Sequence, residues 1–103
     1  MIQNKEGITS IMMYPTAYTL CAIGQDWYKS QLEIQMIPDK VYPDYMQVKD
    51  YISDNIDGKE MNIETVVDVI YKYLSETYAP SYLRVTNHVR GCRTHFDVDV
   101  VKE

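Results

Sequence analysis

Cysteine, basic residues and long apolar runs are all scarce in this chain, and each scarcity argues against a class of protein. Two cysteines, Cys21 and Cys92, do not make a disulfide framework, so we expect reduced thiols unless the fold pairs them. Ten Lys and Arg residues against fifteen Asp and Glu residues, with no basic run, argue against a monomer that binds nucleic-acid backbones. No apolar stretch approaches the roughly 18 residues of a membrane span. We expect a cytoplasmic protein without a membrane partner.

The whole chain, residues 1–103, is expected to fold as a single domain. Its 46% of hydrophobic and 24% of charged residues are typical of a globular protein and not of a disordered one. Only about the first seven residues are expected to lack order, and they contain no apolar signal region. A domain this small buries a limited fraction of its surface, so association with copies of itself is expected.

Four segments have the alternation or the composition of β-strands. Residues 8–20 are rich in Thr, Tyr, Ile and Met, but Pro15 interrupts them, which predicts an edge strand, a bulged strand, or a strand that begins after the proline. Residues 26–37 alternate between apolar and polar side chains, as a half-buried strand does. Residues 82–89 and 94–101 alternate in the same way and predict a C-terminal hairpin.

Two segments between these strands have the periodicity of helices. Apolar residues recur at helical spacing over 44–56, and a longer apolar stripe covers 62–79 before Pro80 ends it. Asn62 is expected to cap the second helix through its side chain, and Glu64 lies in its first turn, where a carboxylate complements the helix dipole. The predicted order is strand, strand, helix, helix, strand, strand. This is an α+β fold in which two helices cover one face of an antiparallel sheet.

The stretch with the most chemistry joins the first two strands: Leu20-Cys21-Ala22-Ile23-Gly24-Gln25-Asp26-Trp27-Tyr28. A thiol at the end of one strand and a carboxylate at the start of the next can face the same pocket. Cys21 then offers a nucleophile and Asp26 a proton carrier. The alternative is structural, since a lone cysteine often packs as a small apolar residue and an aspartate often serves a turn.

The order of these elements resembles the tunnelling fold, whose members include GTP cyclohydrolases, pyruvoyl-tetrahydropterin synthase and the nitrile reductase that acts on 7-cyano-7-deazaguanine. The motifs of the nitrile reductase are the most similar ones. They correspond here to Leu20-Cys21-Ala22, Gly24-Gln25-Asp26-Trp27, Ile37-Pro38-Asp39, Ile63-Glu64 and Arg90-Gly91, in that order. The resemblance covers roughly residues 14–101.

The resemblance implies a role for each of these positions. Cys21 would attack the nitrile carbon and form a covalent thioimide, and Asp26 would supply or relay protons. Glu64 would hold the purine-like edge of the base, while Ile63 and Trp27 would contact it. Arg90 is a weak candidate for binding a cofactor. The resemblance also implies a ring-shaped homo-oligomer that closes the sheets into a barrel.

Several positions depart from the nitrile reductase. Cys21 and Asp26 are five positions apart instead of seven, and Ile63 stands where that family has a histidine. The stretch tied to nicotinamide use is replaced by Tyr42-Pro43-Asp44-Tyr45-Met46-Gln47-Val48-Lys49, so NADPH is a doubtful cofactor. The chain is more similar to a short, cofactor-free relative, which adds ammonia to the same base in tRNA and forms an amidine. A deazapurine, and a tRNA that carries it, are therefore the expected partners.

Three other interpretations remain open on the sequence alone. The chain could be a non-catalytic purine- or pterin-binding protein that kept the pocket and lost the chemistry. It could also be a purely structural oligomeric module. His88, Cys92 and His95 are close enough in sequence to suggest zinc, although a strand, a turn and a strand would have to converge, and the histidines otherwise lie on the solvated face of the hairpin.

Overall fold

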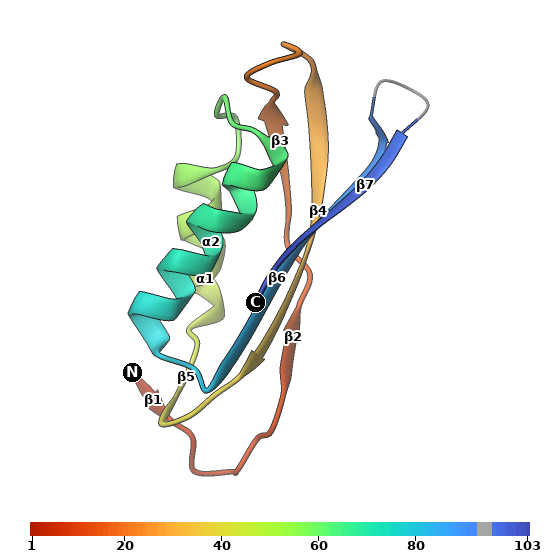
Figure 1. The fold of residues 1–103 in the computed structure, drawn as a ribbon. Coiled ribbons are helices and arrows are strands. Elements are labelled where there is room, and N and C mark those ends of the chain that lie inside the picture. The colour runs from red at the N-terminus through yellow and green to blue at the C-terminus, as the bar shows by residue number, and fades with distance from the viewer. Residues whose placement is uncertain (93–95) are drawn as a thin grey trace.

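The computed structural model describes residues 1–92 and 96–103, and its two helices lie on one face of a five-stranded sheet (Figure 1). The elements in chain order are β1 (Ile2–Gln3), β2 (Ile11–Met13), β3 (Thr16–Leu20), β4 (Trp27–Ile37), β5 (Val41–Tyr42), α1 (Tyr45–Asn55), α2 (Ile63–Tyr78), β6 (Tyr82–Cys92) and β7 (Phe96–Lys102). The predicted α+β fold class is confirmed.

Strand β4 is the centre of the sheet. It pairs antiparallel with β6 on one side, and β6 pairs with β7. On its other side β4 pairs with β2 and then with β3, because the proline between them interrupts a single edge strand. The carbonyl of Pro15 still accepts a hydrogen bond from the Leu32 amide at 2.9 Å, so the interruption is local. Of the three possibilities for residues 8–20, the edge strand is the observed one, and it is interrupted at Pro15.

The core lies between the sheet and the two helices. The side chains of β4 that point toward the helices are buried, as the alternation predicts, and the apolar stripes of both helices cover them. The largest fully buried apolar residues are Ile34, Met36, Ile56, Val66, Val67, Ile70, Leu74, Val85 and Val89. Burial on this scale is the main force that holds helices against a sheet.

The two helices begin in different ways, and one differs from the prediction. The Asp44 carboxylate accepts from the amides of Met46 and Gln47, as an N-cap side chain should. Asn62 stands at the N-cap of α2, but within the described residues its side chain makes no capping hydrogen bond and its Oδ1 is buried without a partner. The predicted Asn62 cap is therefore wrong in its contact, although the helix begins where expected.

Both ends of the chain extend beyond the expected elements. The N-terminal residues that we expected to lack order include β1, which pairs with β5, and the Tyr42 hydroxyl bonds the Glu6 carboxylate. Strand β6 continues past the expected end at residue 89 and reaches Cys92 through a bulge. Such a bulge adds a residue and re-aims the side chains beyond it. Positions 94 and 95 of the last predicted strand lie outside the described residues.

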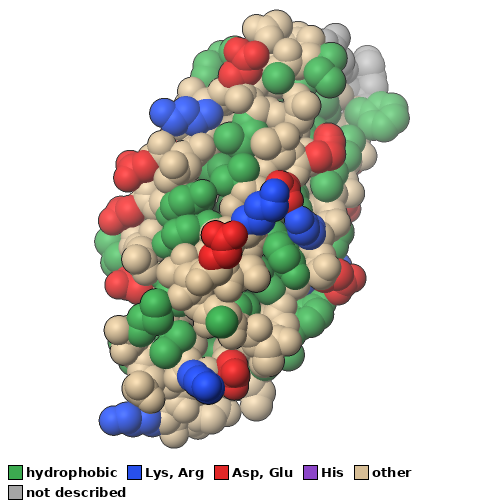
Figure 2. All heavy atoms as spheres, turned by 60° about the vertical axis from the view of Figure 1, so that its left-hand side comes forward, with side chains coloured by type: hydrophobic (Ala, Val, Ile, Leu, Met, Phe, Trp, Pro, Cys, Tyr) green, Lys and Arg blue, Asp and Glu red, His purple; other side chains and the backbone are tan. Residues whose placement is uncertain are grey.

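Acidic and basic side chains are interspersed over the face seen in Figure 2, and no large area of this face has a single charge. Asp68 pairs with Lys72 within α2 at 2.9 Å, and its pair with Lys102 at 2.5 Å links α2 to the end of β7. In the described part of the chain, neither helix is long and apolar enough to cross a membrane.

Candidate functional site

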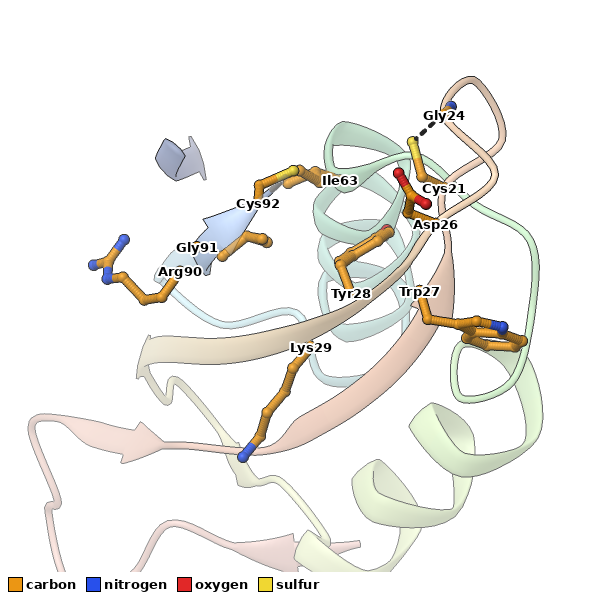
Figure 3. Close-up of a pocket in the computed structure, with 11 residues that line it drawn as sticks. Cys21, Gly24, Asp26, Trp27, Tyr28, Lys29, Ile63, Arg90, Gly91 and Cys92 are labelled. Carbon is orange, nitrogen blue, oxygen red and sulfur yellow. Dashed lines mark hydrogen bonds between the residues drawn. The ribbon is translucent and has the colours of Figure 1, made fainter. Parts of the chain in front are cut away.

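A tight loop between β3 and β4 brings Cys21 and Asp26 together. The Cys21 amide donates to the Asp26 carbonyl at 2.8 Å, and the Gln25 amide donates to the Cys21 carbonyl at 2.8 Å. Gln25 has a φ of 59°, a left-handed conformation that allows so short a connection. The amide of Gly24 donates to the Cys21 sulfur at 3.4 Å, which fixes the position of the thiol. Figure 3 shows the thiol and the Asp26 carboxylate on the same side of the loop.

This loop forms one wall of a pocket of about 170 Å³. The other walls come from the first residue of α2 and from the end of β6, which are far away in sequence. The residues that line the pocket are Cys21, Gly24, Asp26, Trp27, Tyr28, Lys29, Ile63, Val89, Arg90, Gly91 and Cys92. The fold thus gathers Cys21, Asp26, Trp27, Ile63 and Arg90, five of the six candidates from the sequence, around one space.

The loop and the start of α2 are joined by backbone hydrogen bonds. Leu20, just before the cysteine, donates to the Lys59 carbonyl at 2.9 Å and accepts from the Met61 amide at 2.8 Å. The connection between the helices therefore runs parallel to the end of β3 and leads directly into α2. The position of Cys21 is consequently fixed relative to Ile63 and Glu64.

The candidate residues differ in how directly they face the pocket. Glu64 is exposed in the first turn of α2, beside Ile63 but outside the pocket lining. The Trp27 side chain is 61% exposed, and its indole points away from Cys21 and Asp26 (Figure 3). The Arg90 side chain also points away from them, and its guanidinium binds Asp99 at 2.6 Å. Trp27 and Arg90 thus belong to the rim more than to the interior.

The pocket lining also includes residues that the sequence did not assign to this site, among them Tyr28 and Cys92, of which Cys92 was considered only as a zinc ligand. Tyr28 is only 8% exposed, and its hydroxyl donates to the Met61 carbonyl at 2.7 Å. Burial raises the pKa of this phenol, and the nearby Cys21, Glu64 and Cys92 raise it further. Cys92 is a free thiol like Cys21. The alternation of β4 places Tyr28 on the inner face beside the loop and could have identified it, whereas nothing in the sequence indicates the bulge that re-aims Cys92.

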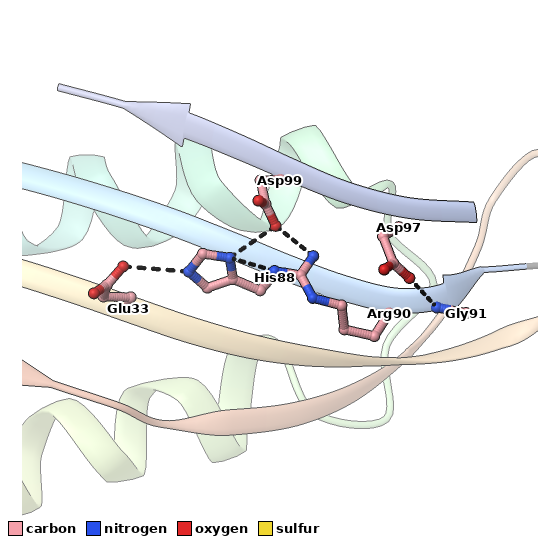
Figure 4. A network of polar contacts seen from close by, with 6 residues as sticks. All are labelled: Glu33, His88, Arg90, Gly91, Asp97 and Asp99. Atoms are coloured by element: carbon pink, nitrogen blue, oxygen red, sulfur yellow. Dashed lines mark hydrogen bonds and ion pairs between the residues drawn. The ribbon is translucent and has the colours of Figure 1, made fainter.

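A separate polar network lies on the face of the sheet opposite the helices (Figure 4). His88 contacts Asp99 through Nδ1 at 2.7 Å and Glu33 through Nε2 at 3.2 Å, and Arg90 binds the same Asp99 oxygen. The hydrogen bond from His88 to Asp99 raises the pKa of His88, burial opposes this rise, and the hydrogen bond to Glu33 adds to it. Arg90 and then His88 hold the pKa of Asp99 below its usual value.

This network bears on the zinc hypothesis. His88 is engaged by carboxylates on the outer face, whereas Cys92 lines the pocket beside Ile63 on the other side. His95 lies outside the described residues. Among residues 1–92 and 96–103 there is no group of three or more His, Cys, Asp or Glu side chains that could hold a metal ion. The convergence that the zinc hypothesis requires is therefore not observed for its described members.

Comparison with known structures identifies the fold. The archaeosine synthase QueF-Like, in its apo form, superposes with a TM-score of 0.81 over 92% of each chain, at 18% sequence identity. A protein from Vibrio cholerae O1 biovar El Tor described as a dihydroneopterin aldolase, FolB, superposes with a TM-score of 0.69 at 17% identity, over 90% of this chain and 95% of the other. No family model and no curated protein sequence matches. The chain has the tunnelling fold, as the order of its elements predicted.

Proposed function

We propose that this protein acts on the nitrile of a 7-cyano-7-deazaguanine base and forms a covalent thioimide at Cys21. The observation that carries the proposal is the shared pocket of Cys21, Asp26 and the start of α2, with the thiol and the carboxylate on one short loop. The fold shared with an archaeosine synthase supports the same class of substrate. Small ligands bind in such concave sites, where a few polar groups converge.

The covalent step needs only the groups present in the pocket and the substrate. The Cys21 sulfur bonds to the nitrile carbon, one π bond of the nitrile breaks, and the nitrogen takes a proton. In this proposal Asp26 supplies or relays that proton. Since a thiol adds to a nitrile without a leaving group, the adduct has the combined mass of protein and ligand.

The second step determines which product leaves. Attack by ammonia would give an amidine and regenerate the thiol, while hydride from NADPH would lead toward an amine. We favour ammonia, because the segment that replaces the nicotinamide motif has structural roles here. Asp44 caps α1, and Gln47 accepts a hydrogen bond from the Tyr78 hydroxyl at 2.5 Å. The base is then one that tRNA carries, as for the short relatives that the sequence resembles.

Glu64 is the proposed anchor for the base. An exposed carboxylate at the start of α2 can accept two parallel N–H bonds from an aminopyrimidinone edge, and charged hydrogen bonds of this kind are strong. Glu64→Gln should weaken binding of 7-cyano-7-deazaguanine about tenfold or more in calorimetry. Glu76→Gln, on the exposed surface of the same helix, is the matched control and should bind normally. Equal affinities in the two variants would contradict the anchor.

A second function is favoured by a specific observation. The likeness to a dihydroneopterin aldolase, together with the shortened separation of Cys21 and Asp26, supports a purine- or pterin-binding protein without thioimide chemistry. Such a protein would bind the base through Glu64 and form no adduct. A purely structural module would neither bind the base nor react with it.

The proposed site is also incomplete in one copy of the chain. Its volume of about 170 Å³ is below the roughly 300 Å³ of common ligand pockets. Glu64 is exposed and is not part of the pocket lining. Both edges of the sheet, β2–β3 and β7, are open in the described chain. We therefore include in the proposal a ring-shaped homo-oligomer in which a neighbouring copy closes the sheet and the pocket.

A further inference from the structure

Tyr28 lies where the two halves of the pocket meet. One half is the loop with Cys21 and Asp26, which ends at the first residue of β4. The other half is the start of α2 with Ile63 and Glu64. Tyr28 belongs to the first half by sequence, and its hydroxyl bonds the Met61 carbonyl, two residues before the helix, at 2.7 Å. The backbone bonds of Leu20 with Lys59 and Met61 join the same two segments, and the Tyr28 hydroxyl adds a side-chain bond beside them.

The surroundings of the phenol show that it belongs to the pocket and not only to the core. Tyr28 lines the pocket together with Cys21 and Cys92, and these two thiols and the Glu64 carboxylate outside the lining all raise the pKa of its phenol. Thr19 lies directly opposite Tyr28 on β3, with its hydroxyl against the phenol. The neutral phenol has one proton, and that proton is used in the bond to Met61.

We propose that Tyr28 is a positioning residue that aligns the nucleophile-bearing loop with the base-binding start of α2. This inference rests on the proposed function, since alignment matters only if Cys21 attacks a ligand that α2 holds. The affinity for the base comes from α2 and the pocket walls, and the intrinsic reactivity of the thiol comes from its loop. Tyr28 sets neither of these. Together with the backbone bonds of Leu20, it sets the geometry between the loop and the start of α2.

Removal of the hydroxyl should therefore affect one kinetic quantity selectively. In Tyr28→Phe the ring still fills its site, but the Met61 carbonyl loses its donor and the two halves can shift. Small misplacements of reacting groups cost up to about 100-fold in rate. We expect the rate of adduct formation at saturating 7-cyano-7-deazaguanine to fall about 10- to 100-fold. The half-saturating ligand concentration should change less than about threefold, since its determinants lie elsewhere.

The experiment follows adduct formation by intact-protein mass over time, for wild type, Tyr28→Phe and a control, Tyr18→Phe. Tyr18 is an exposed tyrosine on the neighbouring strand and should leave both quantities unchanged. Iodoacetamide alkylation of Cys21 is measured in parallel without ligand and should be the same in all three proteins. A merely structural role would instead lower the unfolding temperature, alter alkylation and weaken ligand binding together, and that pattern would overturn the inference.

A second variant tests the hydrogen bond itself and keeps the ring in place if Tyr28→Phe does not fold. Site-specific 3,5-difluorotyrosine at position 28 preserves the shape but ionises at lower pH, and the phenolate cannot donate to Met61. The saturating rate of this variant, relative to wild type, should fall as the pH rises through its phenol pKa. The inference about Tyr28 is contradicted if the ratio of the two saturating rates is constant with pH, or if wild type and Tyr28→Phe have equal saturating rates. Neither result bears on the proposed function. No adduct with wild type contradicts the proposed function as well.

Discussion

At the scale of single residues, the site depends on the short loop between β3 and β4, whose length allows few backbone conformations. Its ends are held by the hydrogen bond from the Cys21 amide to the Asp26 carbonyl, and the left-handed Gln25 donates its amide to the Cys21 carbonyl. The five-residue separation of thiol and carboxylate is therefore compatible with a common pocket. In the proposed reaction, Asp26 acts on the nitrogen while Cys21 acts on the carbon.

The proposed roles of Cys21 as nucleophile and Asp26 as proton donor predict the effect of Asp26→Asn. The amide cannot deliver a proton, and general acid–base catalysis contributes about 10²- to 10⁴-fold. The rate of adduct formation at saturating ligand should fall by about 100-fold or more, with iodoacetamide alkylation of Cys21 little changed. Asp39→Asn, an exposed aspartate in a distant turn, is the matched control. Equal adduct rates for both variants would remove Asp26 from the mechanism.

Part of the site could be predicted because residues with reactive or charged side chains lie close together in the sequence. Cys21 and Asp26 could be paired across one turn, and Ile63 and Glu64 could be placed at the start of a helix. Tyr28 was classified only as an apolar position of a strand, since periodicity does not show which buried side chains border a cavity. Cys92 was assigned to a turn, because no pattern in the sequence marks the bulge that extends β6.

At the scale of elements, the two helices differ at their N-caps. The N-cap side chain of α1 makes capping hydrogen bonds, whereas the N-cap side chain of α2 makes none among the described residues. The Asp44 carboxylate satisfies two amides of α1. Asn62 occupies the corresponding position of α2 without bonding to it, and its neighbours are held by the contacts of Leu20 and Tyr28 with the preceding connection. The start of α2 is thus defined by tertiary contacts.

This difference predicts unequal costs for two matched substitutions. Asp44→Ala should lower the free energy of unfolding by about 1 kcal/mol, because two amides lose their acceptor. Asn62→Ala should change it by no more than about 0.5 kcal/mol, since no capping bond is lost. Urea denaturation of the two variants and wild type gives the comparison. A larger loss for Asn62→Ala than for Asp44→Ala would show that Asn62 caps its helix in solution.

The elements themselves were predictable because their patterns are regular. Alternation over residues 26–37 and helical spacing over 62–79 reproduce β4 and α2 to within one residue at each end. The short strands β1 and β5 were not predicted, since each has two residues and pairs with a segment far away in the sequence. Pro15 indicated an irregular edge, but only pairing with β4 shows that the strand resumes beyond it.

At the scale of the whole molecule, the sheet formed by the described residues has two open edges, and this is the physical argument for assembly. An unpaired edge can pair with another chain, and closure into a barrel removes the exposed backbone groups. In the proposed ring, the β2–β3 edge of one copy and the β7 edge of the next are the available surfaces. The same association would complete the small pocket around Cys21.

Assembly predicts a mass well above that of one chain at micromolar concentration. Sedimentation velocity and native mass spectrometry at micromolar concentration should give a multiple of 12.1 kDa. If the neighbouring copy completes the pocket, dilution into monomers should abolish binding of 7-cyano-7-deazaguanine. A monomer of 12.1 kDa that binds the base with undiminished affinity would contradict the ring.

The most direct test of the central claim is the intact mass of the protein after mixing with 7-cyano-7-deazaguanine, beside a Cys21→Ala control. Our account predicts a single adduct of the full ligand mass on wild type and none on the control, because the thiol adds across the nitrile without a leaving group. Cys92→Ala should still form the adduct. Binding by calorimetry without any adduct, or an adduct that persists in Cys21→Ala, would contradict the proposed thioimide at Cys21.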